Sequence, residues 1–268
     1  MKRFFAGLIV LGTISVGIAG VLAQGAPAQP PAPAAQQPPA AGQQPPPPMS
    51  NLQVYPKDTP RPELVATMQG FVQALGVQSS GGCGYCHAGT APAFDFASDA
   101  KPAKNVARKM ILMSREITAK LPEITGKPAG DVTRLRCATC HRGVAVPKLL
   151  PDILTETVTK QGAAAAVQQY RDLRKQYYGG QSYDFSELSL VSLAGQLNTA
   201  NKPDDALAFL QLNAELYPNS APTFAMMAQA YNRKNDKENA IKNLEKAVQL
   251  DPNNQQLKRQ LDQLKASK

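Results

Sequence analysis

Apolar residues in the second half of the chain recur at the three- and four-residue spacing of amphipathic helices. Residues 163–178, AAAAVQQYRDLRKQYY, predict one such helix. Ala194, Leu197, Asn201, Ala206 and Pro218 recur 34 residues later as Ala228, Tyr231, Asn235, Ala240 and Pro252. A period of about 34 residues built from helix pairs is typical of tetratricopeptide repeats. We therefore expect such repeats over residues 186–268, with NNQQLKRQLDQLKAS as a polar capping helix.

Two more helical stripes precede this array. The stretch RPELVATMQGFVQALGV predicts a helix that stops at Gly76, with its apolar stripe at Leu64, Val65, Met68, Phe71, Val72 and Leu75. The stretch KNVARKMILMSREITAKL predicts another, with its stripe at Val106, Met110, Met113, Ile117 and Leu121. The predicted fold class is therefore mostly α, with a small helical region followed by a repeat array.

The N-terminal residues predict export. Lys2 and Arg3 precede an apolar run that ends in Val21-Leu22-Ala23, which is the layout of a secretory signal peptide over residues 1–23. An uncleaved membrane anchor is the alternative, and both place the rest of the chain in the periplasm or another exported location. Residues 24–60 are rich in Pro, Ala and Gln and predict a disordered tether of polyproline character, or a plain spacer.

Every cysteine and histidine of the chain lies in two short groups, GGCGYCHAG and RCATCHRG. Two disulfides would be strained at this spacing and would not explain the histidines. A four-thiolate zinc site would leave both histidines unused. The sequence Cys-x-x-Cys-His is the attachment group of c-type haem, in which two thiols one helical turn apart reach the two vinyl groups and the histidine ligates the iron. We therefore predict two covalently bound haem c groups, on Cys83, Cys86 and His87 and on Cys137, Cys140 and His141.

With both histidines used, methionine is the remaining choice for the second axial ligand of each iron. Met1 and Met49 lie in the signal and the tether, and Met226 and Met227 lie far downstream. The candidates are Met68, Met110 and Met113. Met68 also fits an ordinary core position, and periodicity alone does not choose between Met110 and Met113.

These residues resemble the cytochrome subunit of photosynthetic reaction centres. In that family each haem unit is a helix with the distal methionine, a turn, and then Cys-x-x-Cys-His, as in MQGFVQALG before CGYCH and ARKMILMSREI before CATCHRG. The resemblance covers residues 62–147. It implies that Met68 and Met110 are the distal ligands and that Arg142 pairs with a haem propionate, although an exposed surface arginine is equally compatible. The family has four attachment groups and this chain has two, so a role in photosynthesis does not follow.

The predicted domains are a dihaem cytochrome c domain at 61–150, a connecting helix and linker at 151–185, and repeats at 186–268. Because two repeats are fewer than the three usually needed, we expect the helix at 163–178 and the haem domain to complete the stack. The repeat surface is predicted to bind a protein or peptide; packing on the haem domain or on another copy is the alternative.

Charge indicates the kind of partner. The net charge is +9, and residues 51–150 hold 13 Lys or Arg against 7 Asp or Glu, whereas residues 151–268 hold 14 against 13. An exported chain without Trp and without a dense basic run is not a nucleic-acid binder. Acidic redox partner proteins, or the anionic groups of a cofactor, fit the basic half better. Contact with a membrane is expected only through an uncleaved N-terminus.

The predicted function is an exported dihaem electron carrier or relay rather than an enzyme. A peroxidase-like haem enzyme needs a positioned acid or base, and no histidine is left to act as one. A haem-bearing scaffold or sensor, in which the repeats perform the main function, is the other alternative.

Overall fold

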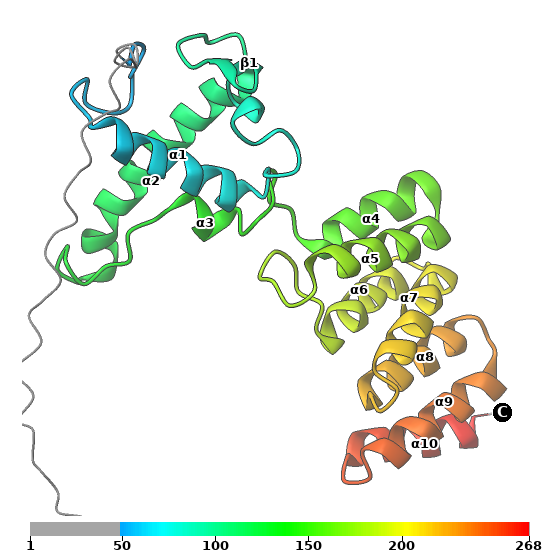
Figure 1. Cartoon of the computed structure of the whole chain (residues 1–268). Helices are drawn as coiled ribbons and strands as arrows, with labels where there is room; N and C mark the ends of the chain where they lie inside the picture. The colour runs from blue at the N-terminus through cyan, green and yellow to red at the C-terminus, as the bar shows by residue number, and fades with distance from the viewer. Residues whose placement is uncertain (1–48, 268) are drawn as a thin grey trace, which may run out of the picture. The chain divides into compact units, whose positions relative to one another are not determined.

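The computed structural model describes residues 49–267, so the predicted signal peptide and most of the predicted tether lie outside the described residues. Ten α-helices, one short 3₁₀ helix and two strands make up this part of the chain (Figure 1). No helix within residues 49–267 is long and apolar enough to span a membrane. The predicted fold class, mostly α with a C-terminal repeat array, is confirmed.

Both predicted helices of the N-terminal half are present and end in the same way. α1 (Arg61–Leu75) is followed by Gly76 with φ 65°, and α2 (Pro102–Thr125) is followed by Gly126 with φ 66°. Each helix also has a proline in its first turn, where a missing backbone N–H costs nothing. Glycine ends both helices because it enters the left-handed region without a steric penalty.

The segment between these helices contains a small hairpin that the sequence analysis did not predict. After the 3₁₀ helix η1 (Gly82–Tyr85), β1 (Ala88–Thr90) pairs antiparallel with β2 (Ala93–Asp95), with Gly89 opposite Phe94. Three-residue strands are too short to produce a recognisable alternation of polar and apolar residues.

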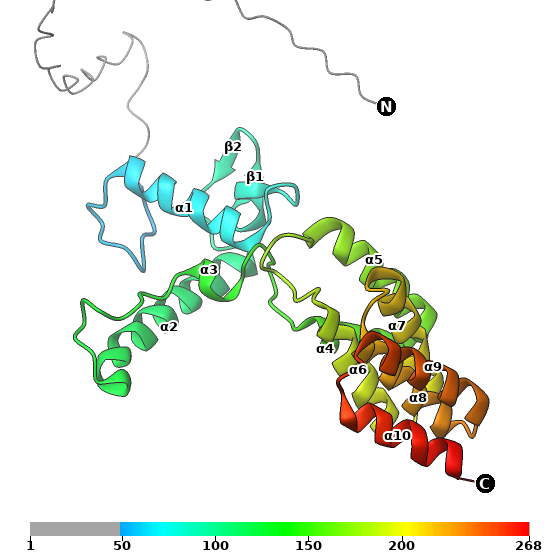
Figure 2. The ribbon, with the colours of Figure 1, turned by 90° about the horizontal axis from the view of Figure 1, so that it is seen from below.

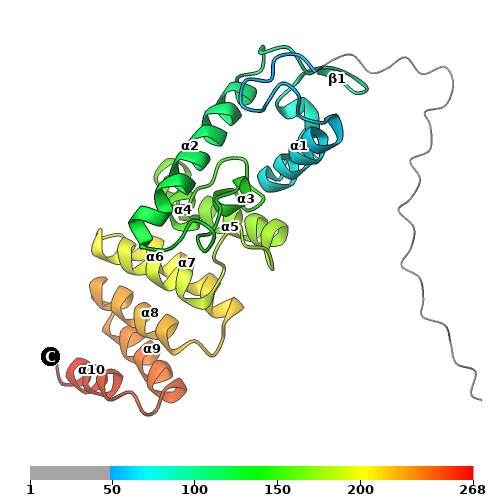
Figure 3. The same ribbon diagram turned by 90° about the vertical axis from the view of Figure 1, so that its left-hand side faces the viewer.

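The C-terminal half is a stack of three helix pairs and a final helix (Figures 1 to 3). The pairs are α4 (Leu150–Gln161) with α5 (Ala163–Tyr177), α6 (Glu187–Thr199) with α7 (Pro203–Leu216), and α8 (Ala221–Arg233) with α9 (Lys237–Leu250). The polar helix α10 (Gln255–Ala266) closes the stack, as predicted, and buries only Leu257. α4 was not predicted. Together with α5 it forms the third helix pair, which the two repeats alone lack.

The 34-residue repeat of the sequence is also a repeat of the backbone. Asn201 and Asn235, one period apart, have φ 59° and φ 58° in the turn inside each pair. The next residue of each turn donates the same backbone hydrogen bond at 2.9 Å, from Lys202 to Leu197 and from Asp236 to Tyr231. Asparagine tolerates this left-handed conformation better than most residues, which explains why it occurs at both positions.

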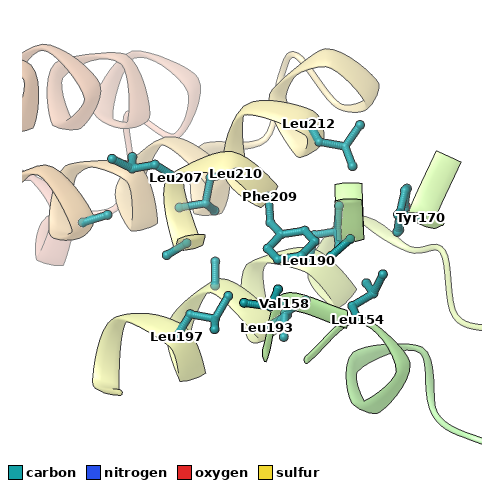
Figure 4. Close-up of a cluster of buried hydrophobic side chains, with 14 of the residues drawn as sticks. Leu154, Val158, Tyr170, Leu190, Leu193, Leu197, Leu207, Phe209, Leu210 and Leu212 are labelled. Carbon is teal, nitrogen blue, oxygen red and sulfur yellow. The ribbon is translucent and has the colours of Figure 1, made fainter. Parts of the chain in front are cut away.

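One continuous hydrophobic core joins α4 to α8. It includes Leu154 and Tyr170 from the first pair and Leu190 and Phe209 from the second, each 0 % exposed (Figure 4). Residues 150–177 therefore share a core with the repeats, and the helix predicted at 163–178 packs in the stack as expected. A second cluster around Ala228, Leu244 and Leu257 extends the packing to the C-terminus.

Candidate functional site

The first Cys-x-x-Cys-His group forms one tight helical turn. Two glycines with positive φ, Gly81 and Gly82, lead the chain into η1. The N–H groups of Cys86 and His87 both donate to the carbonyl oxygen of Cys83, at 3.2 and 3.0 Å. This turn fixes the two thiols three residues apart on one side of the backbone.

The second group has the same local form on a different sequence. α3 (Cys137–Cys140) is a single α-turn in which His141 N–H donates to Cys137 O at 2.9 Å. The hydroxyl of Thr139 accepts from the N–H of Arg136 at 3.0 Å, while Thr139 N–H donates to Arg136 O at 2.9 Å. This reciprocal pair of hydrogen bonds holds the start of the turn.

All four cysteines are free thiols. Burial raises the pKa of Cys86 and of Cys137. Within residues 49–267 no three side chains of the His, Cys, Asp or Glu type are grouped so that they could hold a metal ion. The donor set therefore fits neither disulfides nor a Cys₄ zinc site, and it does fit two thiol pairs available for thioether bonds.

The two histidines are held differently. Nδ1 of His141 lies 3.0 Å from the carbonyl oxygen of Val144, an arrangement in which Nδ1 carries the proton and Nε2 is left to bind iron. His87 instead packs edge-on against Phe96, with ring centroids 4.9 Å apart, and its buried Nδ1 has no hydrogen-bond partner among the described residues. Burial, with help from Lys104 and Arg108, lowers the pKa of His87, which favours the neutral imidazole that a metal requires.

A direct backbone contact joins the second attachment group to the end of α1. The N–H of Gly143 donates to the carbonyl oxygen of Ala74 at 2.8 Å. A Cβ placed on Gly76 would lie 1.9 Å from the Gly143 oxygen, so only glycine fits there. The helix that carries Met68 is thereby tied to the turn that carries His141. The sequence pattern predicts Gly76 only as a helix stop, and this contact carries no local sequence signal.

Asp99 organises the loop beside the first group. Its carboxylate accepts hydrogen bonds from Asn51 at 2.9 Å and from Arg108 at 2.8 Å, and it forms an ion pair with Lys104 at 3.1 Å. Hydrogen bonds from Asn51 and Lys104 are the main cause that lowers the pKa of Asp99 to about 2. The buried Lys104 also donates to three carbonyl oxygens, those of Phe96, Ala97 and Ser98. This network positions Phe96 against His87.

The helix faces around these groups expose unusually large apolar side chains. Val65 in α1 is 47 % exposed, and α2 exposes five large apolar side chains. Val106, Met113, Ile117 and Ile124 share one face of α2 at helical spacing, and Leu112 lies on a neighbouring face. A large exposed apolar face normally marks the binding site of an apolar group or partner. These side chains thus offer apolar surface to a bound cofactor or partner.

The remaining predicted residues occupy the predicted elements. Met68 lies in α1 and Met110 in α2, both half-buried, and Met113 is 45 % exposed. The side chain of Arg142 is exposed, and its backbone has φ 49°. The choice of distal ligands and the role of Arg142 stay predictions. Met226, in contrast, is held in the repeats, where its sulfur accepts a hydrogen bond from Asn198 at 3.5 Å.

Comparison with known families identifies this arrangement. The profile of the photosynthetic reaction centre cytochrome C subunit matches residues 21–232. The chain belongs to this family. The match extends on both sides of residues 62–147, to which we had limited the resemblance. A tetratricopeptide repeat profile matches residues 221–254, which confirms the predicted fusion of a cytochrome with repeats. No curated protein matches the chain.

Membership of the reaction centre cytochrome family implies a c-type cytochrome with covalently bound haem c. The repeats indicate interaction with other proteins.

Proposed function

We propose that this reaction centre cytochrome family member is an exported dihaem protein that relays electrons between partner proteins. The observation that carries the proposal is the pair of matching turns. Each presents two free thiols one helical turn apart, followed at once by a histidine, and both lie in a region rich in exposed apolar side chains. Bound haem c would supply a reversible one-electron change at iron.

In this proposal the chain binds, orients and shields the two haems. Cys83 and Cys86 hold one by thioether bonds, and Cys137 and Cys140 hold the other. The imidazole nitrogen Nε2 of His141 is directed to its iron because Nδ1 is engaged with Val144. When haem is bound, the exposed apolar side chains of α2 would provide surface that packs against it and excludes water. Electron transfer needs little rearrangement of such rigidly held ligands.

Met68 and Met110 are the proposed distal ligands, and Arg142 the proposed partner of a propionate. Methionine with histidine closes both coordination positions and raises the reduction potential, which suits a carrier rather than an oxygen- or peroxide-activating enzyme. The basic charge of residues 51–150 favours acidic redox partners, which the field of this region would attract.

The N-terminal segment supports export, because haem attachment to Cys-x-x-Cys-His and a secretory signal occur in the same chain. We further propose that residues 61–150 act as the cytochrome domain and that residues 186–268 dock a protein partner. The helix pair α4 and α5 links them through the core that it shares with the repeats.

The test is an optical titration of the haem-loaded protein. Carbon monoxide is added to the ferrous form, and the methionine-to-iron band is measured in the ferric form, for wild type, Met68→Ala and Met110→Ala. We expect wild type to ignore carbon monoxide and each variant to open one haem to it. Met226→Leu, in the repeats, is the matched control and should behave as wild type.

Met113→Ala separates the two candidates on α2. If Met113→Ala rather than Met110→Ala opens a haem, the ligand assignment changes but the relay remains. Binding of carbon monoxide to wild type at one haem would contradict the relay proposal and favour an enzyme or sensor.

A further inference from the structure

The repeat half contains a cavity of about 510 Å³ between α5 and α7. Its volume falls in the range of about 300–1,000 Å³ that is usual for pockets that bind small organic molecules. Apolar surface comes from Leu212 and Leu216 of α7 and from the ring of Tyr178 just after α5. Positive charge comes from Arg174 and Lys175. The lining is thus apolar on one side and cationic on the other.

Two buried polar groups lie in the cavity wall. The hydroxyl of Tyr170 and Nη1 of Arg174 are both buried, and neither makes a well-aligned hydrogen bond within the described residues. The two side chains lie close enough to interact with each other, and Arg174 also interacts with Tyr178 and Tyr217. Tyr170 is 0 % exposed, and its ring packs against Phe185 with the centroids 5.5 Å apart. Burial raises the pKa of Tyr170 to about 12, so the hydroxyl keeps its proton and can donate. A buried donor without an acceptor is unfavourable unless a ligand supplies one.

The guanidinium of Arg174 is held in place by rings rather than by an acid. It stacks on Tyr178 at 3.8 Å from the ring centroid and lies 6.0 Å from the ring of Tyr217. No carboxylate forms an ion pair with it among residues 49–267, where the neighbouring Arg171 is paired with Glu215 at 2.6 Å. Asp184, whose charge acts on Tyr170, accepts the Ser186 N–H at 2.8 Å. Arg174 is therefore an oriented and unneutralised cation.

We propose that this cavity binds a carboxylate that carries an apolar group. The carboxylate accepts hydrogen bonds from Tyr170 and Arg174, and the apolar group lies against Leu212, Leu216 and Tyr178. A charged acceptor suits these donors because charge-assisted hydrogen bonds to arginine are the strong ones. Two sources offer this chemistry, namely a free aliphatic acid and the C-terminus of a polypeptide that ends in an apolar residue. The site is independent of the proposed electron relay, since it involves no haem ligand.

Isothermal titration calorimetry of the haem-loaded full chain tests the proposal. The probes are N-acetyl-leucine, N-acetyl-leucinamide, octanoate and inorganic phosphate. We expect saturable binding of at least one of the two carboxylates, and binding of the amide and of phosphate at least about tenfold weaker. N-acetyl-leucine binding tighter than octanoate identifies a polypeptide C-terminus as the source, and the reverse order identifies a free acid.

Variants then locate the binding. Tyr170→Phe removes only the hydroxyl and should weaken binding about threefold to tenfold, and Arg174→Gln should weaken it more than about tenfold. Lys175→Gln, at the exposed rim, should have a smaller effect. Arg233→Gln, an exposed arginine at the end of α8, is the matched control and should bind as wild type. Circular dichroism checks that each variant is folded.

Absence of saturable carboxylate binding by wild type would overturn the proposal. So would equal binding of the acid and the amide, or unchanged binding in the folded Tyr170→Phe and Arg174→Gln variants.

Discussion

The cytochrome half and the repeat half of the described chain bury their apolar residues to very different extents. Only four of the 26 buried hydrophobic residues precede Leu150, namely Ala74, Val77, Ile111 and Val144. Of the eleven exposed large hydrophobics, nine lie between Val65 and Leu149, and only Tyr178 and Leu188 belong to the repeat half. The repeats close their own core, and the cytochrome half does not.

The difference follows from what each half packs against. Helix pairs stacked on helix pairs bury one apolar stripe against the next, so the repeats need nothing but further copies of themselves. The helices of the cytochrome half also carry apolar stripes, but no stripe residue is fully buried, and Val65, Val106, Met113 and Ile117 are exposed. Burial of apolar area contributes about 25 cal/mol per Å², so a covalently held porphyrin against α1 and α2 would supply the missing core.

The most severe test of this contrast removes one attachment group. In Cys83→Ala combined with Cys86→Ala we expect complete loss of one haem, measured by mass spectrometry, because no thiol remains to hold it. Limited proteolysis should then cut within residues 61–149 while residues 150–266 stay protected. The matching pair Cys137→Ala and Cys140→Ala should lose the other haem. Equal protection of both halves in either variant would contradict the idea that the cytochrome half depends on its cofactor.

The reverse test damages the repeat core. Phe209 is 0 % exposed, and Phe209→Ala should lower the free energy of unfolding of the repeats by about 3–5 kcal/mol through lost burial and a cavity. Denaturation followed by far-ultraviolet circular dichroism measures this loss. The haem absorption spectrum of the native variant should not change. Leu188→Ala, at a side chain that is 60 % exposed, is the control and should cost far less.

A smaller effect is expected where the end of α1 contacts the chain just after the second attachment group. Gly76→Ala places a Cβ against the Gly143 carbonyl at a position with φ 65°. The left-handed conformation alone should cost about 1–2 kcal/mol, and the steric clash should add to it. Gly126→Ala is a matched control, since Gly126 ends α2 at φ 66° with nothing within 4 Å of its added Cβ. Equal melting temperatures of the two haem-loaded variants would show that the contact contributes nothing.

The smallest effect concerns pH. Because the pKa of Asp99 is lowered from 3.8 to about 2, its contribution to stability is present above pH 3.8 and is lost as the pH falls toward 2. Asp99→Asn should therefore destabilise the cytochrome half at pH 6 and make little difference at pH 2. Urea denaturation at the two pH values, with the exposed Asp131→Asn as control, measures this. A destabilisation that does not depend on pH would assign the effect to lost hydrogen-bond geometry instead of charge.

Most helices followed from the local pattern of apolar residues, including α1, α2, α5 and the repeats. α4 was not predicted although Leu150, Leu154 and Val158 recur every four residues, because the helix starts where the predicted haem domain ends and falls in the predicted linker. The hairpin of β1 and β2 was missed because its strands are too short for any periodicity.

The sequence by itself determined the chemistry of attachment and the repeat architecture, because both are written in contiguous or strictly periodic residues. Cys83, Cys86 and His87 need only one helical turn to be brought together. Only the tertiary structure decided that Gly76 meets Gly143, that Asp99 joins Asn51 to α2, and that Tyr170 and Arg174 line one cavity with α7. Such contacts depend on how helices far apart in the chain pack, and no local pattern encodes that packing.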